Sequence, residues 1–216
     1  MKVSVTVIRL VFLALFIFLV ATGKMFFWLA LFGVSLVAAI FFGRIYCGYA
    51  CPMNTLMIPT EWISKKLKIQ TDRRPRWLKS SVFAWVFLAI TIALMILSQG
   101  VLRLSLPILP IWLAISVLVT LRYKPEVFHN FICPFGTLQN TFGRFALLTK
   151  KVKAPACIGC GLCEAACPSG AIAVQDGDNK AIIDRKVCHQ CTNCSDICPD
   201  SAITYGKRIR LNNDRG

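Results

Sequence analysis

The chain has 216 residues, of which 56% are hydrophobic, and its lysines and arginines outnumber its acidic residues by 25 to 10, which gives a net charge of +15. Eleven cysteines would suit a disulfide-rich secreted protein, but their grouping into short regular motifs excludes that class. The positive charge does not indicate nucleic-acid binding, because much of it lies in one segment between apolar runs.

Two apolar runs come first, at Val3–Ala21 and Met25–Phe42, and each is long enough for a membrane-spanning helix. Arg9 is the only charge in the first run and lies close enough to its end to reach the membrane surface. Lys2, an apolar centre and the small residues at 21–23 would also fit a signal peptide. Because the second run follows at once, we favour an uncleaved hairpin of two membrane helices.

A basic segment follows at residues 44–79 and holds eight of the 25 lysines and arginines. These are Arg44, Lys65, Lys66, Lys68, Arg73, Arg74, Arg76 and Lys79. The turns within the predicted hairpins carry only Lys24 and Arg103. The positive-inside rule therefore predicts that the basic segment and both termini are cytoplasmic.

Two further apolar runs, at residues 82–98 and 104–121, are near the lower length limit for a spanning helix. A buried bundle in a soluble protein is the alternative, but four apolar runs with almost no polar face disfavour it. We predict a multi-pass inner-membrane domain of four transmembrane helices, in two repeated hairpins, over residues 1–149. The basic linker at residues 149–153 is then expected to lie against anionic membrane lipid.

An internal repeat supports two hairpins, since residues 46–56 align with residues 128–138 at an offset of 82. Each copy carries a C-x₃-C-P element, with histidine replacing the first cysteine of the second copy. A pseudo-twofold axis along the membrane normal would gather four side chains of these elements. They are Cys47, Cys51, His129 and Cys133.

Thiolate and imidazole are both ligands for soft or borderline metals, so these four residues predict a third metal site. Iron–sulfur is the first candidate for its content, copper the second and zinc the third. The alternative is a structural role, since cysteine is common as a small buried apolar residue.

The C-terminal part, residues 150–216, contains the motif C-x₂-C-x₂-C-x₃-C-P twice, at a constant offset of 31 residues. Such runs hold cubane [4Fe-4S] clusters, and the fourth cysteine of each run ligates the other cluster. The predicted ligands are Cys157, Cys160, Cys163 and Cys198 for the first cluster, and Cys188, Cys191, Cys194 and Cys167 for the second. Zinc is disfavoured because its cysteine pairs are separated by a longer spacer.

These motifs resemble those of the bacterial two-cluster ferredoxins, so an α+β ferredoxin-like domain is expected here. Cluster ligands must stay reduced during assembly, which again predicts a cytoplasmic location. His189 lies inside the second run, where all four cysteines are already present, and we expect it to be an exposed loop residue.

Four apolar runs, two C-x₃-C-P elements and a C-terminal pair of cubane motifs together resemble the NapH-type membrane ferredoxins and the C-terminal half of NosR-type proteins. The resemblance implies anaerobic respiration and a membrane electron-transfer subunit that exchanges electrons with the quinone pool and a redox partner protein, as in a quinol dehydrogenase system. His129 departs from the family pattern, which has cysteine at that position.

We therefore expect an iron–sulfur relay. A transmembrane haem route is excluded because His129 and His189 are the only histidines, and an ion pump is disfavoured because the apolar runs carry no acid. Glu61, Glu126 and His129 are candidates for proton exchange with quinone. Two alternatives stay open: a maturation factor that reduces a metal such as copper, and a redox-sensing or anchoring membrane module.

Overall fold

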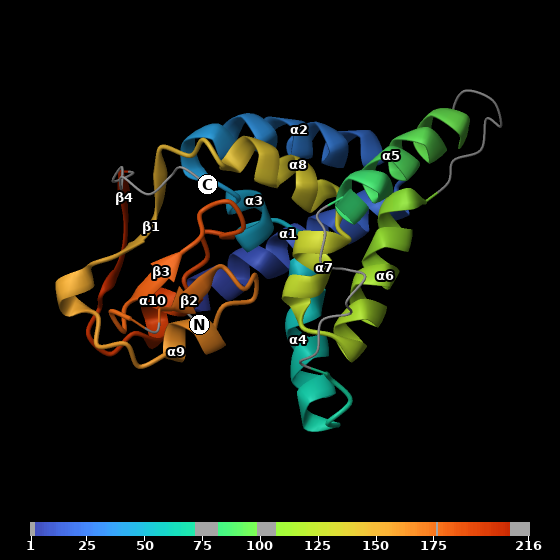
Figure 1. The fold of residues 1–216 in the computed structure, drawn as a ribbon. Coiled ribbons are helices and arrows are strands. Elements are labelled where there is room, and N and C mark those ends of the chain that lie inside the picture. Colours follow the sequence, from blue (N-terminus) through green and yellow to red (C-terminus); the bar gives the residue numbers. More distant parts are fainter. Residues whose placement is uncertain (1–2, 72–81, 99–106, 176, 208–216) are drawn as a thin grey trace.

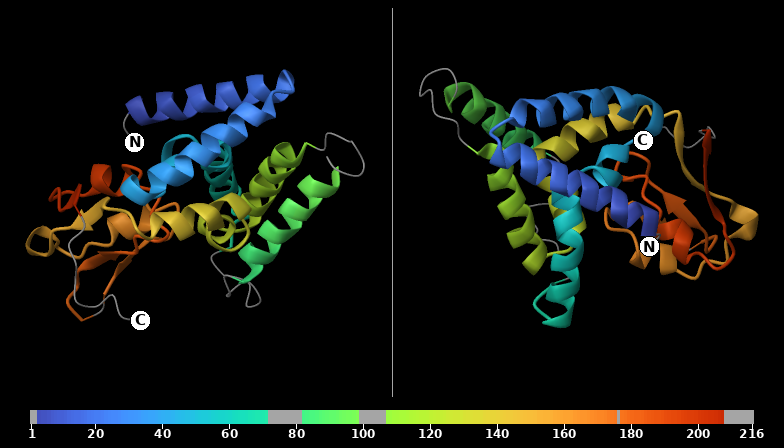
Figure 2. Two further views of the ribbon diagram at one scale, coloured as in Figure 1. Left: turned by 90° about the horizontal axis from the view of Figure 1, so that it is seen from above. Right: turned by 180° about the vertical axis from the view of Figure 1, so that it is seen from behind.

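The computed structural model describes residues 3–71, 82–98, 107–175 and 177–207 (Figure 1). A helical half precedes a small domain of short strands and helices, which lies at one end of it, beside the start of the first helix (Figure 2). The helices of the first half are α1 (Val3–Ala21), α2 (Met25–Phe42), α3 (Ile45–Tyr49), α4 (Pro52–Lys66), α5 (Val82–Ile96), α6 (Ile108–Arg122), α7 (Pro125–Phe131) and α8 (Pro134–Gly143).

Among the described residues, α1 and α2 are the helices long and apolar enough to cross a membrane, with 19 and 18 residues. Helices α5 and α6 are apolar but have only 15 residues each. Fifteen residues span roughly 22 Å, less than the ~30 Å hydrocarbon core of a bilayer. Four transmembrane helices are therefore not confirmed, although the start of the fourth predicted run, residues 104–106, lies outside the described residues.

The basic segment is not the open loop that its charge suggested, because it contains α3 and α4. Arg44 is only 1% exposed, so counting it among surface charges was wrong. Lys65 forms an ion pair with Glu61 one helical turn away, at 2.7 Å. Lys66 and Lys68 are exposed, and the other four basic residues of this segment, Arg73, Arg74, Arg76 and Lys79, lie outside the described residues.

The internal repeat appears as two copies of one helical unit. In each copy a long helix leads to a short one, and a cysteine then precedes a helix that begins with proline: Cys51 before α4 and Cys133 before α8. Proline suits this first position because its fixed φ is helical and its missing N–H would have no partner there. The copies pack on each other reciprocally, with α2 against α8 and α6 against α4 (Figure 1). Within each copy the first helix packs on the last, α1 on α4 and α5 on α8.

Aromatic side chains fill the core of the helical half. Phe32 packs edge-to-face on Tyr46 and on Phe135, both with ring centroids 5.3 Å apart, and so joins α2 to both repeat elements. Trp112 of α6 packs edge-to-face on Phe87, and its ring is tilted by 57° to that of Phe128. Each such pair contributes about 0.5–1.5 kcal/mol beyond the burial of its surface.

The C-terminal domain contains β1 (Leu148–Val152), α9 (Leu162–Ala165), β2 (Ile172–Val174), β3 (Ala181–Ile183), α10 (Asn193–Ile197) and β4 (Ile203–Lys207). Strand β1 pairs antiparallel with β4, and β2 pairs antiparallel with β3. The basic linker is therefore a strand, and Lys150 is buried and donates to Ser195 Oγ at 3.1 Å. The expectation that the whole linker lies on lipid was wrong for this lysine.

Candidate metal centres

The two cysteine runs repeat in backbone conformation as well as in sequence. The third residue of each run has a positive φ: Gly159 (+72°) in the first run and Gln190 (+55°) in the second. The fourth cysteine of each run accepts a backbone N–H bond at 3.3 Å, Cys167 from Ala171 and Cys198 from Ala202. Each run therefore folds around its cysteines in the same way, as cluster-binding loops with N–H groups directed at sulfur require.

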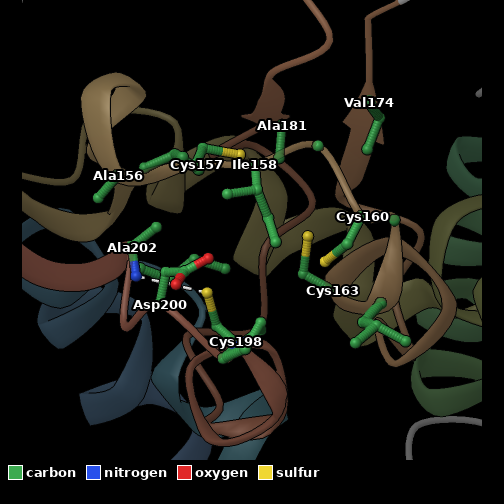
Figure 3. A pocket seen from close by; sticks show the side chains of 16 residues that line it. Ala156, Cys157, Ile158, Cys160, Cys163, Val174, Ala181, Cys198, Asp200 and Ala202 are labelled. Atoms are coloured by element: carbon green, nitrogen blue, oxygen red, sulfur yellow. Dashed lines mark hydrogen bonds between the residues drawn. The ribbon is translucent and has the colours of Figure 1, made fainter.

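The first predicted ligand set lines one pocket, in which Cys157, Cys160 and Cys163 of the first run meet Cys198 of the second (Figure 3). Backbone N–H groups of Ala181 and Gly159 hold the pKa of Cys157 below its usual value. Donors that stabilise a thiolate also stabilise the negative charge of a bound cluster. The donor set thus fits a cubane, and its rim is open, since Cys160 is exposed.

The second predicted ligand set is more deeply buried than the first. Cys188, Cys191 and Cys194 are buried, and burial raises the pKa of Cys188 and Cys194 to about 12. The nearby thiols of Cys191 and Cys167 raise both values further, so the four sulfur atoms lie in one group. Thiols this hard to ionise become thiolates when iron shares their charge, so this set also fits a cubane.

The backbone conformation of the first cysteine loop can be tested by a substitution at Gly159. We expect Gly159→Ala to destabilise the ferredoxin domain by roughly 2–4 kcal/mol, because φ is positive and the added Cβ would overlap the carbonyl oxygen of Asn179. Thermal unfolding and iron content measure the loss. Gly177→Ala is the control, since nothing lies within 4 Å of a Cβ added there. Equal stability of the two variants would contradict this account of the loop.

The second loop is packed against the helical half. The backbone of His189 lies so close to Gly48 of α3 that a Cβ on Gly48 would overlap the His189 carbonyl. Tyr49 Oη donates to the Gln190 carbonyl at 3.5 Å, and Arg44 Nη1 donates to the Val187 carbonyl at 3.5 Å. The buried cluster set therefore lies at the junction of the two halves.

Two residues at this junction correct the sequence predictions. Arg9 is 2% exposed and donates from Nε to the Gly48 carbonyl at 2.8 Å, so it does not extend to a membrane surface. His189 is 1% exposed, so the prediction of an exposed loop residue was wrong. Both side chains are buried because α1, α3 and the second cysteine loop pack together. The sequence of the cysteine run gave no indication of this packing.

His189 packs edge-to-face on His129, with ring centroids 4.5 Å apart and an interplanar angle of 87°. Burial lowers the pKa of His129 to about 3, and the Arg44 guanidinium lowers it further. Burial likewise lowers the pKa of His189, so both imidazoles are neutral. Among the described residues, neither ring nitrogen of His189 nor Nε2 of His129 has a hydrogen-bond partner.

The third predicted site is only partly gathered. Cys47, Cys51 and Cys133 are all buried in one core cluster, and beyond the effect of burial the Cys47 thiol raises the pKa of both Cys51 and Cys133. The ring of His129, by contrast, contacts Phe128 and His189. Within the described ranges, no three histidine, cysteine, aspartate or glutamate side chains are placed to hold one metal ion. The four-ligand site stays a prediction.

Of the acids predicted to exchange protons, Glu61 and Glu126 line one cleft of about 630 Å³ between the helical half and the ferredoxin domain. Glu61 is paired with Lys65, and Glu126 packs against Gly170 beside the second cluster set. His129 lies elsewhere, on a separate cavity. The structure therefore does not bring the three candidates together.

Comparison with known proteins agrees with these motifs. A 4Fe-4S binding domain family matches residues 25–70 and 105–155, which contain the two repeat elements, and a 4Fe-4S dicluster domain family matches residues 156–202. No solved structure matches the chain.

Three relatives are similar over most of the chain. An uncharacterized protein of Methanocaldococcus jannaschii is 29% identical, over 80% of this chain and 68% of its own length. The ferredoxin-type protein NapH of Haemophilus influenzae is 23% identical, over 84% and 69%. The methylamine utilization ferredoxin-type protein MauN of Paracoccus denitrificans is 26% identical, over 67% of this chain and 56% of its own length.

Cysteine spacing, loop geometry and family matches together define a 4Fe-4S ferredoxin-type electron-transfer protein. Its two apolar N-terminal helices and its relatives indicate association with a membrane. The resemblance noted from the sequence is confirmed, and the chain is a NapH-like 4Fe-4S ferredoxin.

Proposed function

We propose that this protein is a membrane-bound electron relay in which the two cluster sites face different partners. The observation that carries the proposal is their unequal placement. The Cys188 loop is buried against α3, whereas Cys160 in the other loop is exposed and Ile158 beside it is 63% exposed. An exposed cluster rim with an apolar neighbour suits a docking redox protein, and the buried site suits exchange with the helical half.

The eight cysteines would hold two [4Fe-4S] clusters, and each cluster can carry one electron at a time. The chain supplies charge around the buried site: Arg9 and Lys150 both favour the thiolate form of Cys191, and Arg44 lies against Val187 beside the loop. Fixed positive charges stabilise the additional negative charge of a reduced cluster. The neutral side chains of His129 and His189 are buried at the same junction.

The membrane-side partner is proposed to be the quinone pool, which the resemblance noted from the sequence implies, and α1 and α2 are long and apolar enough to lie in a bilayer. The ferredoxin domain and both termini are placed in the cytoplasm, on the basic side of the predicted topology. A reporter fused after Gly216 should then behave as cytoplasmic and one inserted at Gly23 as exported. An exported reporter at Gly216 would overturn this orientation.

The relay is tested on the full chain, purified anaerobically in detergent. Iron and sulfide quantitation should give two cubanes, and EPR should show both reduced by dithionite and oxidised in separate steps during a redox titration. A reduced quinol or a soluble ferredoxin should reduce at least one of them. Clusters that accept electrons from neither donor would favour a sensing or anchoring module and would overturn the relay.

A third centre at Cys47, Cys51, His129 and Cys133 remains a separate proposal, supported by the closeness of the three thiols. The double variant Cys51→Ser, Cys133→Ser should then lose metal while keeping both cubanes, because neither residue is among the eight predicted cubane ligands. Metal content and redox titration measure this. Bound copper in the wild type would favour the metal-reducing maturation factor, and identical metal content in both proteins would leave the cysteines a structural role.

A further inference from the structure

A cavity of about 210 Å³ is lined by α5, α7 and α8 and by Lys186 of the ferredoxin domain. Two of its lining residues, Arg144 and Lys186, carry a positive charge, and none of the lining residues in the described part of the chain is acidic. Asn140 and Thr141 of α8 add an amide and a hydroxyl group. A cavity with two cations and no acid indicates an anionic ligand.

A third cation lies behind the wall of this cavity. The Nη2 atom of Arg44 lies 3.0 Å from the position that a Cβ on Gly136 would take, and Gly136 is one of the lining residues. Arg44 is only 1% exposed, and its Nε and Nη2 atoms have no hydrogen-bond partner among the described residues. An anion beside Gly136 would therefore offset the charge of a buried guanidinium group.

Exposed apolar side chains lie next to the lining residues in the sequence. Trp85 lines the cavity and is about half exposed, as is Val86 beside it on α5. After α8, the Arg144 guanidinium lies over the Phe145 ring, 4.6 Å from its centroid, and Phe145 and Leu147 are more than half exposed. Exposed aromatic residues together with cations are typical of a protein surface at the level of the lipid head groups.

We infer that this cavity binds the phosphodiester head group of an anionic phospholipid with a hydroxylated head, such as phosphatidylglycerol, an inference that rests on the proposed membrane-bound relay. The phosphate accepts hydrogen bonds from Arg144 and Lys186. The glycerol hydroxyls donate to Oδ1 of Asn130, a lining residue whose Oδ1 is buried and has no hydrogen-bond partner among the described residues. The acyl chains lie along the apolar surface that begins at Trp85.

The position of the cavity in the chain agrees with this ligand. Helix α5 begins three residues after the basic segment ends at Lys79, on the side that is predicted to be cytoplasmic. Basic pockets between membrane helices on that side bind the head groups of anionic lipids. Because Arg144 follows α8 and Lys186 belongs to the ferredoxin domain, one phosphate in contact with both would hold that domain against the helical half.

The test is equilibrium binding of dihexanoyl phosphatidylglycerol to the full-length protein, purified in a non-ionic detergent and freed of lipid. Dihexanoyl phosphatidylcholine, which has the same chains and no net charge, should bind about tenfold more weakly. The double variant Arg144→Gln, Lys186→Gln should weaken binding of phosphatidylglycerol roughly 30-fold, about fivefold for each charge removed. The matched control is Lys153→Gln, Lys207→Gln, which removes the same charge from exposed residues outside the cavity.

A further variant, Asn140→Phe, fills the cavity without a change in charge and should also weaken binding, which separates a cavity site from attraction to surface charge. Iron content and thermal unfolding identify any variant that misfolds, and Arg144 and Lys186 are exposed, so their double variant is expected to fold. Equal affinity for the two lipids, or equal weakening in the matched control, would overturn the site.

Inorganic phosphate distinguishes the two sources of such an anion. Displacement of phosphatidylglycerol by an equal concentration of inorganic phosphate would show a site for free anions and overturn the lipid assignment. If phosphatidylglycerol does not bind while a soluble ferredoxin still reduces the clusters, the lipid site fails and the relay stands. If it binds with the expected losses in the variants while neither donor reduces the clusters, the relay fails and the lipid site stands.

Discussion

Replacing Gly48 with alanine is expected to detach the ferredoxin domain from the helical half without unfolding either. A Cβ at this position would overlap the carbonyl oxygen of His189 and lie 3.5 Å from the Cys191 amide, both backbone groups that cannot rotate away. Overpacking of this kind costs about 1–3 kcal/mol, and here it acts directly between the two halves. The connection between α8 and β1 should then be cleaved by proteases about tenfold faster.

The matched control is Gly33→Ala in α2, because nothing lies within 4 Å of a Cβ added there. The redox potential of the second cluster is a further readout, since separation would admit water beside Cys191 and move it away from Arg9. Unchanged proteolysis and potential in Gly48→Ala would mean that the two halves do not pack as described.

The second large effect is expected from Cys198→Ser. Although Cys198 belongs to the second run, it lines the pocket of Cys157, Cys160 and Cys163, so its loss should remove the exposed cluster. Serine is a poor ligand because its hydroxyl does not ionise readily. About half of the iron should be lost, and the EPR signal that remains should be that of the buried cluster.

Cys194→Ser is the comparison, because it lies four residues away in the same run but should remove the buried cluster instead. The two variants should therefore retain different EPR signals with different potentials. If both retained the same signal, each run would hold its own cluster and the crossed ligand assignment would be wrong.

The cysteine loops could be predicted from sequence because their function fixes their spacing. Three sulfur atoms must meet one cube face, so the C-x₂-C-x₂-C pattern constrains the backbone, and the offset of 31 residues reappears in matching positive φ angles and N–H···S bonds. The helices that begin at Pro52 and Pro134 follow from local chemistry in the same way.

The surroundings of these loops could not be predicted, because they depend on contacts between distant segments. His189 looked exposed when its run was considered alone, and it is buried by α3 and α7, more than fifty residues earlier in the chain. Arg9 and Arg44 were counted as surface charges for the same reason. Gly48 offered a signal, since glycine in a short apolar helix often marks a close backbone approach.

The reciprocal packing of the two repeats determines when, during synthesis, the helical half can complete its packing. Since α2 needs α8 and α4 needs α6, the first repeat leaves the ribosome with neither of its partner helices available. We expect the helical half to reach its final packing only after synthesis has passed residue 143, the end of α8. The earlier helices would meanwhile be covered by an insertion machinery or by lipid, and the cysteine runs, translated after α8, would take up iron when the helical half is already packed.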